Sequence, residues 1–249
     1  MYHQRIAAAV ALGLAATAAA GPRVIITEIM YNPASVEGRG ESEWVEIANV
    51  GDEDAHVKGW RLDDEDRDDW APFDCEIPPG GVVVLYNSGA VTEADFRAAW
   101  DVPQADAPGS AGREPAYQAV GVSWGSLGNQ AAGDNETLRL LDAAGAVVCE
   151  VNYSHQPPWP DLAAAHGSSI ALIDHAAENL SDGRVWAASR ELQGAWKCRV
   201  AGVFAGRDVG SPGLAATVGT GNPPPVPPRS PSEAPAGPPV DRDRDQVPF

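Results

Sequence analysis

Short apolar segments rich in β-branched residues alternate with turn residues along most of the chain, and this pattern constrains the fold more than any other feature. Such segments occupy residues 24–30, 43–49, 82–86, 136–141 and 147–153. Many short strands separated by turns, with little helix, indicate two packed antiparallel sheets. The expected fold class is therefore all-β, an antiparallel β-sandwich, and a parallel α/β fold is disfavoured.

Three parts of the chain carry more specific expectations. Residues 82–86 are apolar on both faces, which predicts a central strand covered on each side. Residues 136–141 and 147–153 flank a turn that contains Gly145, which predicts a hairpin. Residues 92–100 break the strand pattern, with Thr92 suited to cap a short helical insertion.

The two ends of the chain differ in composition from the middle. Arg5 precedes an uncharged apolar run at residues 6–16 and an Ala-x-Ala site at 18–20, which predicts a signal peptide over residues 1–20. Residues 215–249 are rich in proline and poor in apolar residues, which predicts a disordered tail. The sandwich domain is expected over residues 23–214, with no membrane span once the signal peptide is removed.

The charge balance is acidic, with 17 Lys and Arg against 35 Asp and Glu and a net charge of −18. Such a surface repels nucleic-acid phosphates and anionic lipids, so nucleic acid is an unfavoured partner. The same surface could attract divalent cations or basic proteins.

An exported chain can form disulfides, and this one has three cysteines, Cys75, Cys149 and Cys198. The strand pattern places Cys149 on one inward face with Val147, and places Cys75 inward on another strand. A Cys75–Cys149 bridge would close a loop of about 75 residues and stabilise the fold by about 4 kcal/mol. The alternative is three buried free thiols, and the sequence leaves both open.

An acidic run offers carboxylates that could bind a structural calcium ion. The weak candidate ligands are Asp63, Asp64, Asp66 and Asp68. The run lacks the glycine and the terminal glutamate of an EF-hand loop, and a solvated loop is the alternative. The histidines show no zinc-binding spacing.

Two further motifs suggest functions other than simple binding. Gly121, Ser123 and Gly125 match the G-x-S-x-G pattern of serine hydrolases, but the following residues are typical of a turn and not of a helix. Trp159 lies in a proline-rich stretch, where an exposed indole could stack on a sugar. A hydrolase and a carbohydrate-binding module are therefore the alternative functions.

Several blocks, in this order, resemble the bacterial form of the lamin-tail domain. They are residues 26–33, 43–49, 57–62, 77–85, 135–153 and 210–213. The resemblance implies an immunoglobulin-like antiparallel β-sandwich of the lamin-tail type, in an exported bacterial protein. The family has no general catalytic residues to carry over, so no catalytic residue and no obligate cofactor is expected.

Together these features predict a secreted, non-catalytic module in the periplasm, at the cell surface or in the medium. It is expected to be a binding or structural module at the cell envelope. Its partner is expected to be a protein or a cell-surface polymer.

Overall fold

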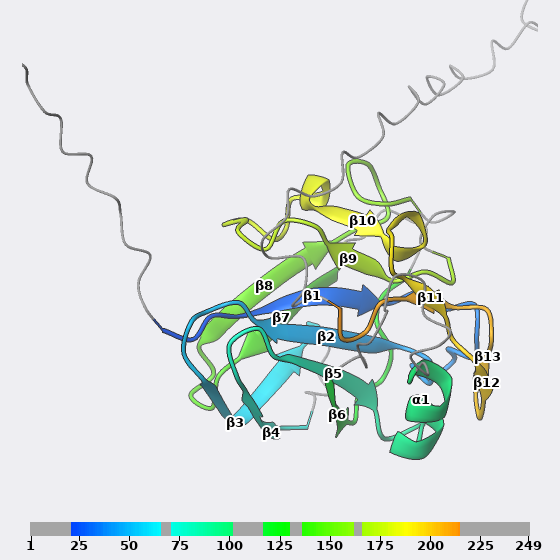
Figure 1. Cartoon of the computed structure of the whole chain (residues 1–249), viewed down its shortest axis with the longest axis horizontal. Coiled ribbons are helices and arrows are strands. Elements are labelled where there is room, and N and C mark those ends of the chain that lie inside the picture. The colour runs from blue at the N-terminus through cyan, green and yellow to red at the C-terminus, as the bar shows by residue number, and fades with distance from the viewer. Residues whose placement is uncertain (1–20, 66–70, 102–116, 130–135, 162–165, 215–249) are drawn as a thin grey trace, which may run out of the picture.

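Two β-sheets packed face to face form the framework of the computed structural model (Figure 1). The structure describes residues 21–65, 71–101, 117–129, 136–161 and 166–214. The segments expected as a signal peptide and as a proline-rich tail lie outside this part of the chain.

The larger sheet has six strands and the smaller sheet has four. In sheet order, the six strands are β10 (Trp186–Ala188), β9 (Ile170–Leu172), β1 (Val24–Met30), β2 (Trp44–Asn49), β5 (Val82–Asn87) and β6 (Tyr117–Val122). The four strands are β4 (Phe73–Ile77), β3 (Ala55–Asp63), β7 (Glu136–Leu141) and β8 (Val147–Tyr153).

The main core lies between the two sheets. Ile47 and Leu85 from the six-stranded sheet are fully buried there, together with Leu62, Leu138 and Val151 from the four-stranded sheet. The alternation of inward and outward side chains along these strands is what the sequence pattern predicts. The immunoglobulin-like β-sandwich is therefore confirmed.

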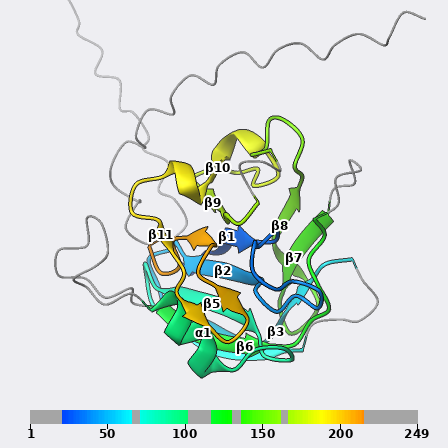
Figure 2. The same cartoon turned by 90° about the vertical axis from the view of Figure 1, so that its right-hand side faces the viewer.

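The outer face of the six-stranded sheet is also covered. Its cover is made of α1 (Glu93–Trp100) and two small β-ladders, visible side by side in Figure 2. The ladder strands are β11 (Trp196–Lys197) with β14 (Val209–Gly210), and β12 (Val200–Ala201) with β13 (Phe204–Ala205). Trp44 of the sheet meets Trp100 of the helix edge-to-face at 5.3 Å between ring centroids. The central strands β1, β2 and β5 are therefore buried on both faces.

The predicted helix and central strand are confirmed, with one departure in strand direction. The Thr92 side chain accepts a hydrogen bond from the Asp95 backbone N–H and caps α1. Strand β5 lies between β2 and β6, but it pairs with β6 in parallel. The expectation of a wholly antiparallel sheet is wrong here, because the long connection that contains α1 returns the chain in the same direction.

The hairpin of β7 and β8 is confirmed, but its inward face was predicted incorrectly at one end. Leu140 pairs with Cys149 and Leu141 pairs with Val147, so Val148 is the extra residue of a β-bulge. The bulge turns Val147 outward, and its side chain is 54% exposed. The expectation that Val147 and Cys149 share the core face is therefore wrong.

The described residues contain no helix long and apolar enough to span a bilayer.

Candidate functional site

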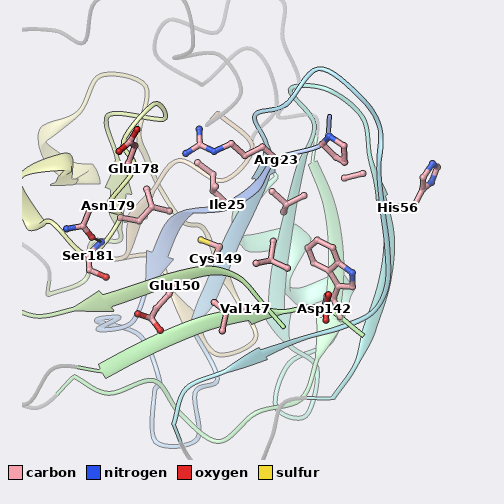
Figure 3. A pocket seen from close by; sticks show the side chains of 16 residues that line it. Arg23, Ile25, His56, Asp142, Val147, Cys149, Glu150, Glu178, Asn179 and Ser181 are labelled. Atoms are coloured by element: carbon pink, nitrogen blue, oxygen red, sulfur yellow. Dashed lines mark hydrogen bonds between the residues drawn. The ribbon is translucent and has the colours of Figure 1, made fainter. Parts of the chain in front are cut away.

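A groove opens where the two sheets approach each other without pairing. It has a volume of about 720 Å³ and is lined mainly by residues 22–25 of β1 and the chain before it, residues 147–150 of β8, and residues 178–181. We call it the edge groove. Figure 3 shows Ile25 and Cys149 near its middle, between Glu178 towards one end and Asp142 towards the other. Its volume lies in the range of ligand-binding clefts.

The edge groove has an apolar floor and an apolar mouth. Val24, Cys149 and Leu180 are buried in its floor. Val147 and Val148 at its mouth are 54% and 39% exposed, and they are two of four large exposed apolar side chains in the described chain. Contiguous exposed apolar side chains beside a concave surface are typical of a binding site.

Strand β8 presents a free edge beside this mouth. It is the last strand of its sheet, with β7 on one side and no paired strand on the other among the described residues. The Asn152 N–H donates to the Ser181 hydroxyl at 2.9 Å, so the backbone of Asn152 points away from β7. The backbone of Glu150, two residues earlier, points to the same side.

The charged side chains around the edge groove are mostly carboxylates. Asp142, Glu150 and Glu178 lie on its lining. Glu150 accepts a hydrogen bond from Arg139 Nε at 2.7 Å, across the ladder from β7. His56 lies farther out, and Figure 3 shows its ring directed away from the groove.

Among the described residues, Arg23 is the one arginine or lysine on the lining of the edge groove, and backbone atoms already hold it. Its guanidinium donates to the carbonyl oxygens of His175 at 2.9 Å and Ala177 at 3.0 Å. These bonds attach the loop before residue 178 to the start of β1. Arg23 therefore shapes one wall and keeps its positive charge, because carbonyl oxygens are neutral acceptors, and the three carboxylates on the lining outnumber it.

The structure contradicts the disulfide that the sequence left open. Cys75, Cys149 and Cys198 are all free thiols. Cys75 lies on β4 and Cys149 on β8, the two outer strands of the four-stranded sheet. Two strands separate them at about 4.8 Å per step, so their Cα atoms lie beyond the roughly 7 Å that a disulfide can span. Burial raises the pKa of the Cys149 and Cys198 thiols to about 11 and that of Cys75 to about 12.

The acidic run is only partly described. Arg139 forms ion pairs with Asp63 at 3.3 Å and with Glu65 at 3.2 Å, which neutralises part of the run. Asp64 is 5% exposed. Asp66 and Asp68 lie outside the described residues. Among the described residues no group of three or more potential ligands could hold a metal ion, and calcium binding stays a prediction.

Ser123 lies exposed directly after β6, the edge strand of the six-stranded sheet. The described chain from Ser123 to Asn129 contains no helix. A nucleophile elbow holds its serine on a sharp turn between a strand and a helix, with a histidine in reach. No hydrogen bond between Ser123 and a histidine occurs within the described residues, and the geometry gives no support for a hydrolase.

Trp159 is not available for stacking on a sugar. Its side chain is 5% exposed and packs in the main core against Trp186, with ring centroids 5.7 Å apart. The suggestion that Trp159 forms an exposed stacking platform is therefore wrong.

Sequence reasoning missed a pair of buried glutamates. Glu28 of β1 and Glu46 of β2 lie directly opposite each other, 2% and 0% exposed, on the outer face of the six-stranded sheet. Burial raises the pKa of both carboxyls, and the Glu28 charge raises the pKa of Glu46 further, to about 8. A polar residue within an otherwise apolar strand is the one sequence signal that could have pointed to them.

The glutamate pair attaches the last described segment to the sheet. Ser211 donates to Glu28 through its backbone N–H and its hydroxyl, each at 2.8 Å. The Gly213 N–H donates to Glu46 at 2.6 Å. The hydroxyls of Ser169 and Ser189 complete the shell of Glu28, and that of Thr27 binds Glu46 at 2.7 Å. Both carboxyls are enclosed away from solvent, so this arrangement is structural.

Comparison with known protein families gives one match. A family model described as the lamin tail domain matches residues 17–155, which is more than half of the chain. The matched region ends just after β8 and includes both strands that flank the edge groove. No curated protein matches the chain.

Proposed function

The chain belongs to the lamin tail domain family, and on that premise we propose that it is an exported, non-catalytic module that binds a partner protein at the cell envelope. Membership of this family supports a structural or binding immunoglobulin-like module. The proposal adds the compartment and places the contact at the edge groove.

Two features support export. Residues 1–20 have the charge and apolar pattern of a signal peptide. The Gly21 N–H donates to Asp52 at 2.7 Å, and the Asp52 N–H donates to the Gly21 carbonyl at 3.3 Å. Cleavage after Ala20 would therefore leave every described strand intact, and it would place the new ammonium group beside the Asp52 carboxylate.

The observation that carries the binding role is the pair of exposed valines at the mouth of the edge groove. Val147 and Val148 lie next to each other beside a strand edge that is unpaired among the described residues, whereas the other two large exposed apolar side chains of the described chain, Val36 and Val200, lie outside the groove lining. Exposing them to water costs free energy, and a partner that covers them recovers it. Ser123 offers no comparable support for a hydrolase.

Site-specific photocrosslinking in the native host tests both parts of the proposal. A photoreactive amino acid replaces Val148 in one full-length variant and Val200, which is 80% exposed and not part of the groove lining, in a matched control. We expect the Val148 variant to crosslink a defined envelope protein that the Val200 variant does not. Recovery of the chain in the cytoplasm with residues 1–20 still attached would refute export, and equal crosslinks from both positions would refute the groove as the contact.

A further inference from the structure

We propose that the partner supplies an extended, basic segment that adds as a strand to the free edge of β8. This inference rests on the proposed binding role and names the chemistry of the partner. Strand addition uses backbone hydrogen bonds for affinity and alternate side chains for specificity.

The edge of β8 has the backbone groups that such a strand needs. Asn152 and Glu150 direct their N–H and C=O groups away from β7, towards the groove side. Ser181 occupies the Asn152 N–H through its hydroxyl. Within the described residues the Asn152 carbonyl and the Glu150 N–H and carbonyl have no partner on the groove side, so an incoming strand could bind them. Towards the other end, the bulge at Val148 breaks the regular ladder, so the docking stretch is short.

The groove beside this edge selects apolar side chains on one face of the incoming strand. Side chains two residues apart in a strand point the same way, at about 6.6 Å spacing. The row on the outer face of the sheet would lie beside Val148 and Glu150, because these two residues point away from the buried Cys149. The other row would point towards the apolar floor near Leu180. An apolar row therefore fits the floor, whereas a lysine in the outer row would pack its methylene chain on Val148 and reach the Glu150 carboxylate.

The polar face of the segment should be basic. Asp142, Glu150 and Glu178 lie around the groove against one lining guanidinium of the described chain, that of Arg23, and Arg139 pairs with Glu150 from β7. The whole chain carries a net charge of −18, which speeds the approach of a basic partner and slows that of an acidic one.

The same charge argues against two other occupants. A second copy of this acidic chain would bring like charges to the groove, and a charged edge residue such as Glu150 discourages pairing between identical edges. Residues 215–249 of this chain contain ten prolines, which lack the N–H needed for a strand ladder, and their charges nearly cancel.

Three synthetic hexapeptides test the proposal on the purified full-length protein by isothermal titration calorimetry. The first alternates valine and lysine, the second alternates valine and glutamate, and the third is the first with alternate backbone amides N-methylated. We expect binding of the valine–lysine peptide, at least tenfold weaker binding of the other two, and weaker binding at high salt. Val148→Asn, which removes the apolar contact without adding a charge, should weaken binding of the first peptide at least tenfold, and Val200→Asn should leave it unchanged.

The outcomes separate this inference from the proposed function. If N-methylation leaves the affinity unchanged, or if the glutamate peptide binds as well as the lysine peptide, strand addition by a basic segment is refuted. The groove can still be the contact site in that case, provided that the photocrosslink at Val148 persists. Concentration-dependent dimerisation that is abolished by Val148→Asn would instead assign the edge to a second copy and overturn the inference.

Discussion

Replacing Glu46 by glutamine should change how the stability of the fold depends on pH. The Glu46 carboxyl is fully buried, and burial together with the nearby Glu28 charge raises its pKa from 4.5 to about 8. A raised pKa means that the folded state holds the proton more tightly than the unfolded state. The stabilising effect is complete below pH 4.5 and is lost as the pH rises through about 8.

The magnitude follows from the same values. Each pKa unit corresponds to about 1.4 kcal/mol, so ionising Glu46 makes folding about 5 kcal/mol less favourable above pH 8 than in acid. Glutamine is close in shape to the protonated acid and does not titrate. It keeps an acceptor for the Gly213 N–H, and it can donate to the Thr27 hydroxyl. We expect the variant to lose about 1 kcal/mol at pH 5 and to gain several kcal/mol at pH 9.

Thermal unfolding of the wild type and of Glu46→Gln between pH 5 and pH 9 measures the difference. The melting temperature of the variant should exceed that of the wild type by roughly 10 °C at pH 9. Glu43, whose pKa burial also raises to about 8, titrates in both proteins and cancels in the comparison. Glu53→Gln, a change at an exposed carboxylate outside the edge groove, is the control and should follow the wild type. If the melting temperatures of Glu46→Gln and of the wild type change equally with pH, the raised pKa of Glu46 is refuted.

Three further predictions follow from single positions. Mass spectrometry after alkylation of the unfolded, unreduced protein should find three modified thiols, whereas one modified thiol and a protein mass lower by two hydrogens would restore the Cys75–Cys149 bridge. In the folded protein at pH 8, alkylation of Cys149 should be slow, because burial raises the pKa of its thiol to about 11. Trp186→Ala should lower the free energy of unfolding in urea by about 3–5 kcal/mol, because the 2% exposed indole packs on Trp159 and donates to the Leu180 carbonyl. A loss of under about 1 kcal/mol would contradict this packing. Ser123→Ala should leave the melting temperature and any esterase activity of the purified protein unchanged, and loss of a measured esterase activity would revive the hydrolase.

Local sequence patterns predicted much of the sandwich. The period-two alternation of β7 and β8 is a local property, so it identified the hairpin without knowledge of the fold. The continuous apolar run of β5 likewise identified a strand covered on both faces. The parallel pairing of β5 with β6 was not predictable, because it depends on the path of the long connection between them.

The edge groove and the glutamate pair depend on contacts between distant segments. A single bulge at Val148 turns Val147 outward, and nothing in the alternation of β8 marks the position of that bulge. Glu28 and Glu46 are buried because residues 196–214 fold back over the outer face of the sheet. The sequence showed these glutamates within apolar strands, but it could not show what covers them.

Amide hydrogen exchange tests most directly whether the edge groove is a binding surface that accepts a strand. The rate at each backbone amide is compared with and without saturating valine–lysine hexapeptide. We expect exchange to slow at the Glu150 amide of β8 and to stay unchanged at the Val200 amide of β12. Protection that appears elsewhere and leaves Glu150 as fast as in the free protein would contradict this expectation.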